Sequence, residues 1–254
     1  MSFDLPKGWG DDLLSEFQTI AFENELATFV HAPQWQQGLL DVATVLQKCS
    51  SYAMKSILNS EDPSALLLFL TARNYYLASV RSVTAGHCLA AYPIGRATVE
   101  AALYGWYLSS NKDAALRWNN KPTKREELKV WAKEFNFSNL TKNVSEVNEE
   151  LAKWAKHLHQ LAIDFGAHPN KDALYSNIVH EDGEDGAVII KMVTLHPWNF
   201  LSISTTKFTI ETGINAIKFF ALGFPEGAQT LSLTQDLNRL TKNLSDLQDT
   251  IKLT

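Results

Sequence analysis

The sequence predicts a mainly α-helical protein, a bundle of about seven helices with one inserted β-hairpin. Apolar residues recur at helical spacing over most of the 254 residues, which is the pattern of helices that bury one face. A content of 45% hydrophobic and 20% charged residues is typical of a globular domain. Only one stretch alternates β-branched and apolar residues around an acidic turn. No internal repeat or Gly/Ser linker divides the chain, so residues 1–254 are expected to form a single domain.

Four helices are expected in the first half of the chain. Ala32-Pro33 separates the first two, and Asp62-Pro63 begins the third as an N-cap followed by proline. Tyr92-Pro93 is expected to end or kink it, because the residue before proline avoids the helical conformation. The expected ranges are 11–30, 35–58, 62–90 and 94–108.

The second half combines helices with the hairpin. Thr123 and Glu126 form a capping box that begins a helix through Phe135. A long helix is expected over 140–165, ended by Gly166 and His168-Pro169. The inserted hairpin spans 175–195, with strands 175–180 and 187–195, and a further helix covers 200–222.

The C-terminal helix, expected over 226–254, carries leucines that alternate four and three residues apart. This heptad seam is sustained for nearly three repeats. It indicates either a terminal helix packed on its own bundle or a subunit interface, and the second alternative predicts a homo-oligomer. The seam consists of Leu233, Leu237, Leu240, Leu244, Leu247 and Ile251.

Composition restricts the compartment and the partners. A formal net charge of −5 argues against a general nucleic-acid binder. Two cysteines are too few for a disulfide framework, and the N-terminus has no basic region followed by an apolar run. The longest apolar stretches are far shorter than the ~20 residues of a membrane span. We therefore expect a cytoplasmic protein with no membrane partner.

Four polar residues form a candidate cluster. Arg96 and Glu100 lie one turn apart on an apolar helix, and Asp164 and His168 lie at the end of a later helix. If the two helices are neighbours, these side chains meet in one polar site, where the acids raise the pKa of His168. The alternative is structural: an internal Arg96–Glu100 ion pair, with His168 capping its helix. His157 and His159, at the flanks of the apolar stripe, are interpreted as solvated surface residues.

This arrangement resembles a group of uncharacterised bacterial helical proteins loosely related to the HEPN-like superfamily. The shared pattern begins with a helix that carries Arg96-x-x-x-Glu100. A later helix ends in a polar residue that is followed, after three residues, by His168-Pro169, and a hairpin and another helix come next. It covers roughly residues 62–222. The group usually has Ser where this chain has Asp164. Some HEPN-like proteins are ribonucleases of defence and toxin systems, so the resemblance implies RNA as a substrate.

The ribonuclease signature of HEPN domains, an Arg followed a few residues later by a His, has one match here, Arg81 to His87. Ser82 stands where the family usually has Asn, Asp or His. On a continuous helix the two side chains would point about 120° apart.

The leading hypothesis is a non-enzymatic, homo-oligomeric binding or regulatory module, because no catalytic motif stands out while the heptad seam suggests an interface. The rival is an HEPN-like ribonuclease that uses Arg81 and His87, or Arg96 and His168. A third hypothesis places a small anion or a metal at Arg96, Glu100 and His168. His180 and His196 lie near the hairpin, but their spacing with His168 matches no metal motif, so neither a metal nor a cofactor is predicted.

Overall fold

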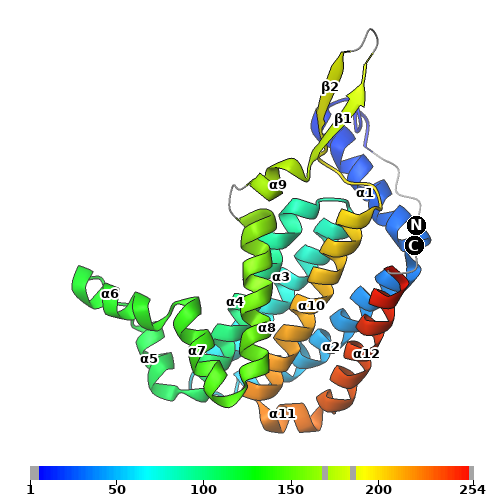
Figure 1. Cartoon of the computed structure of the whole chain (residues 1–254). Helices are drawn as coiled ribbons and strands as arrows, with labels where there is room; N and C mark the ends of the chain where they lie inside the picture. Colours follow the sequence, from blue (N-terminus) through cyan, green and yellow to red (C-terminus); the bar gives the residue numbers. More distant parts are fainter. Residues whose placement is uncertain (1–5, 168–170, 184–186, 252–254) are drawn as a thin grey trace.

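The computed structural model describes residues 6–167, 171–183 and 187–251 (Figure 1). They form a mainly helical protein with a single small antiparallel hairpin, which confirms the predicted fold class, but with more helices than the seven or so expected. The helices of the first half are α1 (Leu13–His31), α2 (Pro33–Ile57), α3 (Ser64–Thr84), α4 (Cys88–Ser110), α5 (Lys112–Asn119) and α6 (Arg125–Glu134). Those of the second half are α7 (Phe137–Val147), α8 (Glu149–Ala162), the π-helical turn η1 (Ile163–Ala167), α9 (Lys171–Tyr175), α10 (Phe200–Gly223), α11 (Pro225–Thr230) and α12 (Leu233–Ile251).

The break between α3 and α4 lies at Gly86, so the expected break at Tyr92-Pro93 is wrong. Gly86 has φ of +91°, and a Cβ there would lie 2.6 Å from the carbonyl oxygen of His196, so only glycine fits. Pro93 instead lies inside α4. Because proline has no N–H, the carbonyl oxygen of Leu89 receives no hydrogen bond from residue 93. Gly166 of η1 packs against this oxygen so closely that a Cβ on residue 166 would lie only 2.5 Å from it.

The expected 140–165 helix is divided. Asn148 has an extended backbone (φ −156°), and its side chain accepts a hydrogen bond from the Leu151 amide at 2.9 Å, so it ends α7 and caps α8. The expected capping box at Thr123 and Glu126 is also wrong, because α6 begins at Arg125 with no side-chain cap.

The hydrophobic core surrounds α10, the central helix. Phe208, Ile214, Ile217 and Phe219 are all buried on it, and α2, α3, α4 and α8 pack around it. Burial on every side outweighs the weak helix propensity of its threonines and isoleucines, because tertiary packing supplies most of the stability of a helix in a protein.

The heptad seam of α12 packs on its own chain. Leu233, Leu240, Leu244 and Leu247 are buried against the bundle, and α12 lies beside α2 (Figure 1). This agrees with the first of the two alternatives, a terminal helix packed on its own bundle. Oligomerisation itself stays a prediction.

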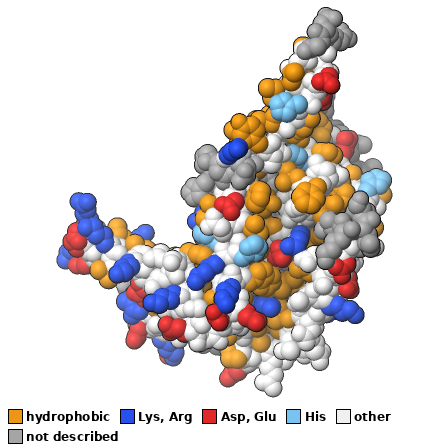
Figure 2. Space-filling model, in the orientation of Figure 1, with side chains coloured by type: hydrophobic (Ala, Val, Ile, Leu, Met, Phe, Trp, Pro, Cys, Tyr) orange, Lys and Arg blue, Asp and Glu red, His pale blue; other side chains and the backbone are white. Residues whose placement is uncertain are grey.

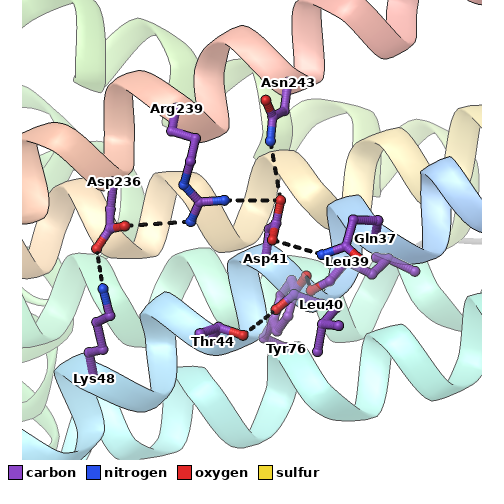
Figure 3. A network of polar contacts seen from close by, with 10 residues as sticks. All are labelled: Gln37, Leu39, Leu40, Asp41, Thr44, Lys48, Tyr76, Asp236, Arg239 and Asn243. Carbon is purple, nitrogen blue, oxygen red and sulfur yellow. Dashed lines mark hydrogen bonds and ion pairs between the residues drawn. The ribbon is translucent and has the colours of Figure 1, made fainter.

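Polar contacts fasten α12 to α2 (Figure 3). Arg239 forms an ion pair with Asp41 at 3.1 Å, and Asn243 donates to the same carboxylate at 3.1 Å. Lys48 pairs with Asp236 of α12 at 2.8 Å. Arg239 and Lys48 thus each pair with a carboxylate on the other helix. These ion pairs fix the position of α12 along α2.

The hairpin extends away from the helical body (Figure 1). Strand β1 (Ile178–Asp182) pairs antiparallel with β2 (Val188–Met192), with His180 opposite Ile190. Within the described residues, none of the helices has the length and apolar character that a membrane crossing needs.

Candidate functional site

Arg96 and Glu100 do meet, and their third partner is His159 of α8. The Arg96 Nε donates to Glu100 Oε1 at 2.7 Å, and His159 Nε2 lies 3.0 Å from the same oxygen. The His159 ring stacks on Phe137 with the ring centres 3.7 Å apart. We name Arg96, Glu100 and His159 the Glu100 cluster.

The sequence interpretation of His159 as a solvated residue is wrong, whereas His157 is exposed as expected. A signal was available, because His159 lies four residues after Ala155 and three before Ala162, both fully buried. This spacing places it on the buried face of α8.

The electrostatics of the Glu100 cluster favour a structural ion pair. Burial alone would raise the pKa of Glu100, but the hydrogen bonds from His159 and Arg96, together with their charges, outweigh it and hold the pKa below its usual value. The carboxylate is therefore ionised at neutral pH and is bound by groups of its own chain. It ties α4 to α8.

Of the other two members of the predicted cluster, only Asp164 lies within the described residues, and its hydrogen bond is to another residue. Asp164 accepts a hydrogen bond from Gln160 at 2.7 Å, one turn earlier in the chain. His168 lies outside the described residues. Of the two histidines near the hairpin, His196 is buried with its Nε2 2.6 Å from Asn177 Oδ1, and His180 is on β1. The described residues contain no group of three or more His, Cys, Asp or Glu side chains placed to hold a metal.

Arg81 and His87 line one groove, contrary to what a continuous helix would give. The helix ends at Thr84 and the chain turns at Gly86, which brings His87 to the same side as Arg81. The groove has a volume of about 660 Å³ and lies between α1 and the end of α3. We name it the α1 groove.

The α1 groove combines aromatic and titratable side chains. Arg81 Nε lies 3.2 Å from Glu25 Oε1 of α1, and the His87 ring packs edge-on against Phe17. Trp9 and Phe22 also line it. Burial lowers the pKa of His87, against the opposing effect of Glu25, so its imidazole is neutral at pH 7.

Helix α1 is inverted relative to the expected amphipathic pattern. Its buried residues are Ser15 and Thr28, and the Thr28 hydroxyl donates to the Thr84 carbonyl at 3.0 Å. The large apolar side chains point outward: Leu13 is 85% exposed, and the others that are exposed are Leu14, Ile20, Phe22, Leu26, Phe29 and Val30. The helical spacing of the sequence predicts an apolar core stripe of Leu13, Leu14, Phe17, Ile20, Ala21 and Leu26 on this helix. Phe17 and Ala21 are half-buried, but the other four are exposed, so the predicted stripe is wrong for them.

The hairpin also presents an apolar face. Side chains alternate between the faces of a strand, so Val188, Ile190 and Met192 of β2 share one face, and they are 65%, 65% and 68% exposed. Their partners on β1, which lie on the same face, are Asp182, His180 and Ile178. The opposite face carries the Glu181–Lys191 ion pair. Figure 2 shows hydrophobic side chains gathered over the lower part of the hairpin.

Comparison with known proteins gives no match to a family model, to a curated protein or to a solved structure. The functional argument therefore depends on the chemistry of the described surfaces.

Proposed function

We propose that the protein is a non-enzymatic binding module that acts as a homodimer, with the outward face of α1 and the apolar face of the hairpin as its interface. The observation that carries this proposal is the exposure of large apolar side chains on α1, whose fully buried residues are Ser15 and Thr28. Large contiguous apolar surfaces on proteins mark interaction sites.

The exposed area is sufficient for a stable dimer. Seven large apolar side chains on α1, each roughly half exposed or more, present on the order of 700 Å², against about 800 Å² per partner in a standard interface. The hairpin adds further apolar area.

The hairpin supports a second copy as the partner. Two strands alone are marginal in water, and a third strand or a packed face is needed for stability. A two-fold axis would bring the same surface of each copy together, so one apolar patch covers another.

The test is the molar mass in solution, measured by light scattering coupled to size exclusion. We expect twice the 28.4 kDa of one chain, and a shift to monomer in Phe29→Glu and in Ile190→Glu. Val130→Glu, at an exposed apolar position on α6, is the matched control and should remain dimeric. A monomeric wild-type chain at micromolar concentration would contradict the proposal, as would variants that stay dimeric.

A cytoplasmic location and a bacterial origin are part of the same proposal. The support for the location is that Cys49 and Cys88 are buried as free thiols, which fits a reducing compartment. Burial raises the pKa of Cys49 to about 12, so this thiol is inert rather than reactive.

A second candidate function is an HEPN-like ribonuclease that acts on single-stranded RNA. The specific observation in its favour is that Arg81 and His87 line the same groove, with a neutral imidazole available as a base. RNA cleavage without added metal, lost in His87→Ala and retained in His157→Ala, would support it. Uncleaved RNA, or equal cleavage by both variants, would refute it.

A further inference from the structure

A cavity between α2 and α3 carries two cations and no acid. Its volume is about 500 Å³, and it is lined by Lys55 and Arg73 together with Gln47, Ser50, Ser51 and Asn74. None of the described residues that line it is Asp or Glu. We name it the cationic cavity.

The two cations of this cavity lack the partners that other cations nearby have. Lys48, two turns before Lys55 on α2, pairs with Asp236, and Arg239 pairs with Asp41. Among the described residues no carboxylate forms an ion pair with Lys55 or Arg73, and the Arg73 Nε is buried without a hydrogen-bond partner. The described part of the chain therefore gives neither cation a carboxylate partner. The Nε itself is covered by protein, so an anion in the cavity would meet the terminal nitrogens of the guanidinium instead.

Helix electrostatics explain only part of this arrangement. Lys55 lies in the last turn of α2, where the helix dipole favours a cation. Arg73 lies in the middle of α3, where no such effect acts. The chain as a whole is acidic, with a net charge of −5, so two unpaired cations at one cavity are not the result of a generally basic surface.

The donors match an anion. The Arg73 guanidinium and the Lys55 ammonium are the side chains that bind phosphate and carboxylate oxygens, and the hydroxyl and amide groups beside them supply further N–H and O–H donors. The neighbouring acceptors are themselves neutral. The site therefore favours a negatively charged group.

An apolar cavity of about 670 Å³ continues from the cationic one. The two share Gln47, Ser51 and Lys55, and the apolar cavity runs along Leu40 and Ala43 of α2 to Leu231. We propose that the α2–α3 surface binds a small organic anion, with its charged group between Lys55 and Arg73 and its apolar part along α2 toward Leu231. Both volumes are in the range of sites for small molecules.

The test is calorimetric titration of the full chain with octyl phosphate, inorganic phosphate and octanol. We expect octyl phosphate to bind more tightly than either of the others, because only it has both a charged group for the cationic cavity and an apolar chain for the apolar one. Arg73→Gln and Lys55→Gln should each weaken octyl phosphate binding by about tenfold or more. Leu231→Ser, at the apolar end of the proposed site, should weaken octyl phosphate but leave inorganic phosphate unchanged.

The controls separate this site from other effects. Lys142→Gln removes an exposed cation on α7 and should bind octyl phosphate as the wild type does. Thermal unfolding of each variant verifies that it is folded. No octyl phosphate binding at millimolar concentration would overturn the proposal, and so would equal binding by Arg73→Gln and the wild type. The site uses neither α1 nor the hairpin, so a monomeric chain would contradict the proposed function and leave this inference standing.

Discussion

Substitution of Leu240 tests whether α12 stabilises its own chain or holds two chains together. Its side chain is 2% exposed and lies on the heptad seam, buried against the bundle. In Leu240→Ala three carbon atoms leave the core, which costs roughly 2.4 kcal/mol at about 0.8 kcal/mol per carbon. The cavity left behind adds to this, so the loss of unfolding free energy is expected to be about 3 kcal/mol, within the usual range for Leu→Ala in cores.

Urea unfolding followed by circular dichroism measures this loss. The midpoint should fall for Leu240→Ala, while the control Asn238→Ala, an exposed position on the same helix, should stay within about 0.5 kcal/mol of the wild type. Light scattering should give the same molar mass for both variants. The reasoning is refuted if Leu240→Ala keeps the wild-type midpoint and instead dissociates, because the seam would then be a subunit interface.

Three further predictions concern titration and backbone strain. The pKa of Glu100 is lowered on folding, so its ion pairs stabilise the protein at pH values above the ordinary pKa of 4.5, and this stabilisation is lost as the pH falls through the folded pKa. The urea midpoint should therefore decline more steeply with falling pH for the wild type than for Glu100→Gln. Parallel declines for the two proteins would contradict this prediction. Gly86→Ala should destabilise the chain by more than the roughly 1–3 kcal/mol of backbone strain alone, because a Cβ at residue 86 would also clash with the backbone of His196. The control is Gly10→Ala, where φ is +98° but nothing lies near the added Cβ, so that only the strain acts. Equal losses of unfolding free energy in urea for the two variants would exclude the clash. The His87 imidazole should titrate below 6.5 by NMR, because burial is the main influence on its pKa; a midpoint at or above 6.5 would show that Glu25 dominates.

The predictable part of the fold was the part that follows from local periodicity. The helical class, the hairpin and the helix around residues 200–222 follow from spacing and turn residues. Proline correctly marked the starts of α2 and α3 but not a break at residue 93. Pro93 is accepted inside α4, where its missing hydrogen bond coincides with a close approach by Gly166. The break at Gly86 did have a local signal, a glycine with φ of +91° just after the last turn of α3. The contact of Gly86 with the backbone of His196, more than a hundred residues away in sequence, has no local signal.

Of the contacts in the candidate site, the sequence predicted only the one between Arg96 and Glu100 on the same helix. Arg96 and Glu100 are one turn apart, so their contact follows from helix geometry. His159 comes from another helix, and its place depends on how α8 packs on α4. The groove that joins Arg81 and His87 depends in the same way on a turn, and the inversion of α1 has no local signal because its apolar residues surround the whole helix.

The central position of α10 has a consequence for synthesis on the ribosome. The helix begins only at Phe200, although it fills the middle of a core whose other walls are built from α2, α3, α4 and α8. Domains synthesised N-terminus first fold as units once their parts are present. For most of its translation the nascent chain therefore exposes the apolar walls that α10 will cover, and the core is completed only after residue 223 has left the exit tunnel.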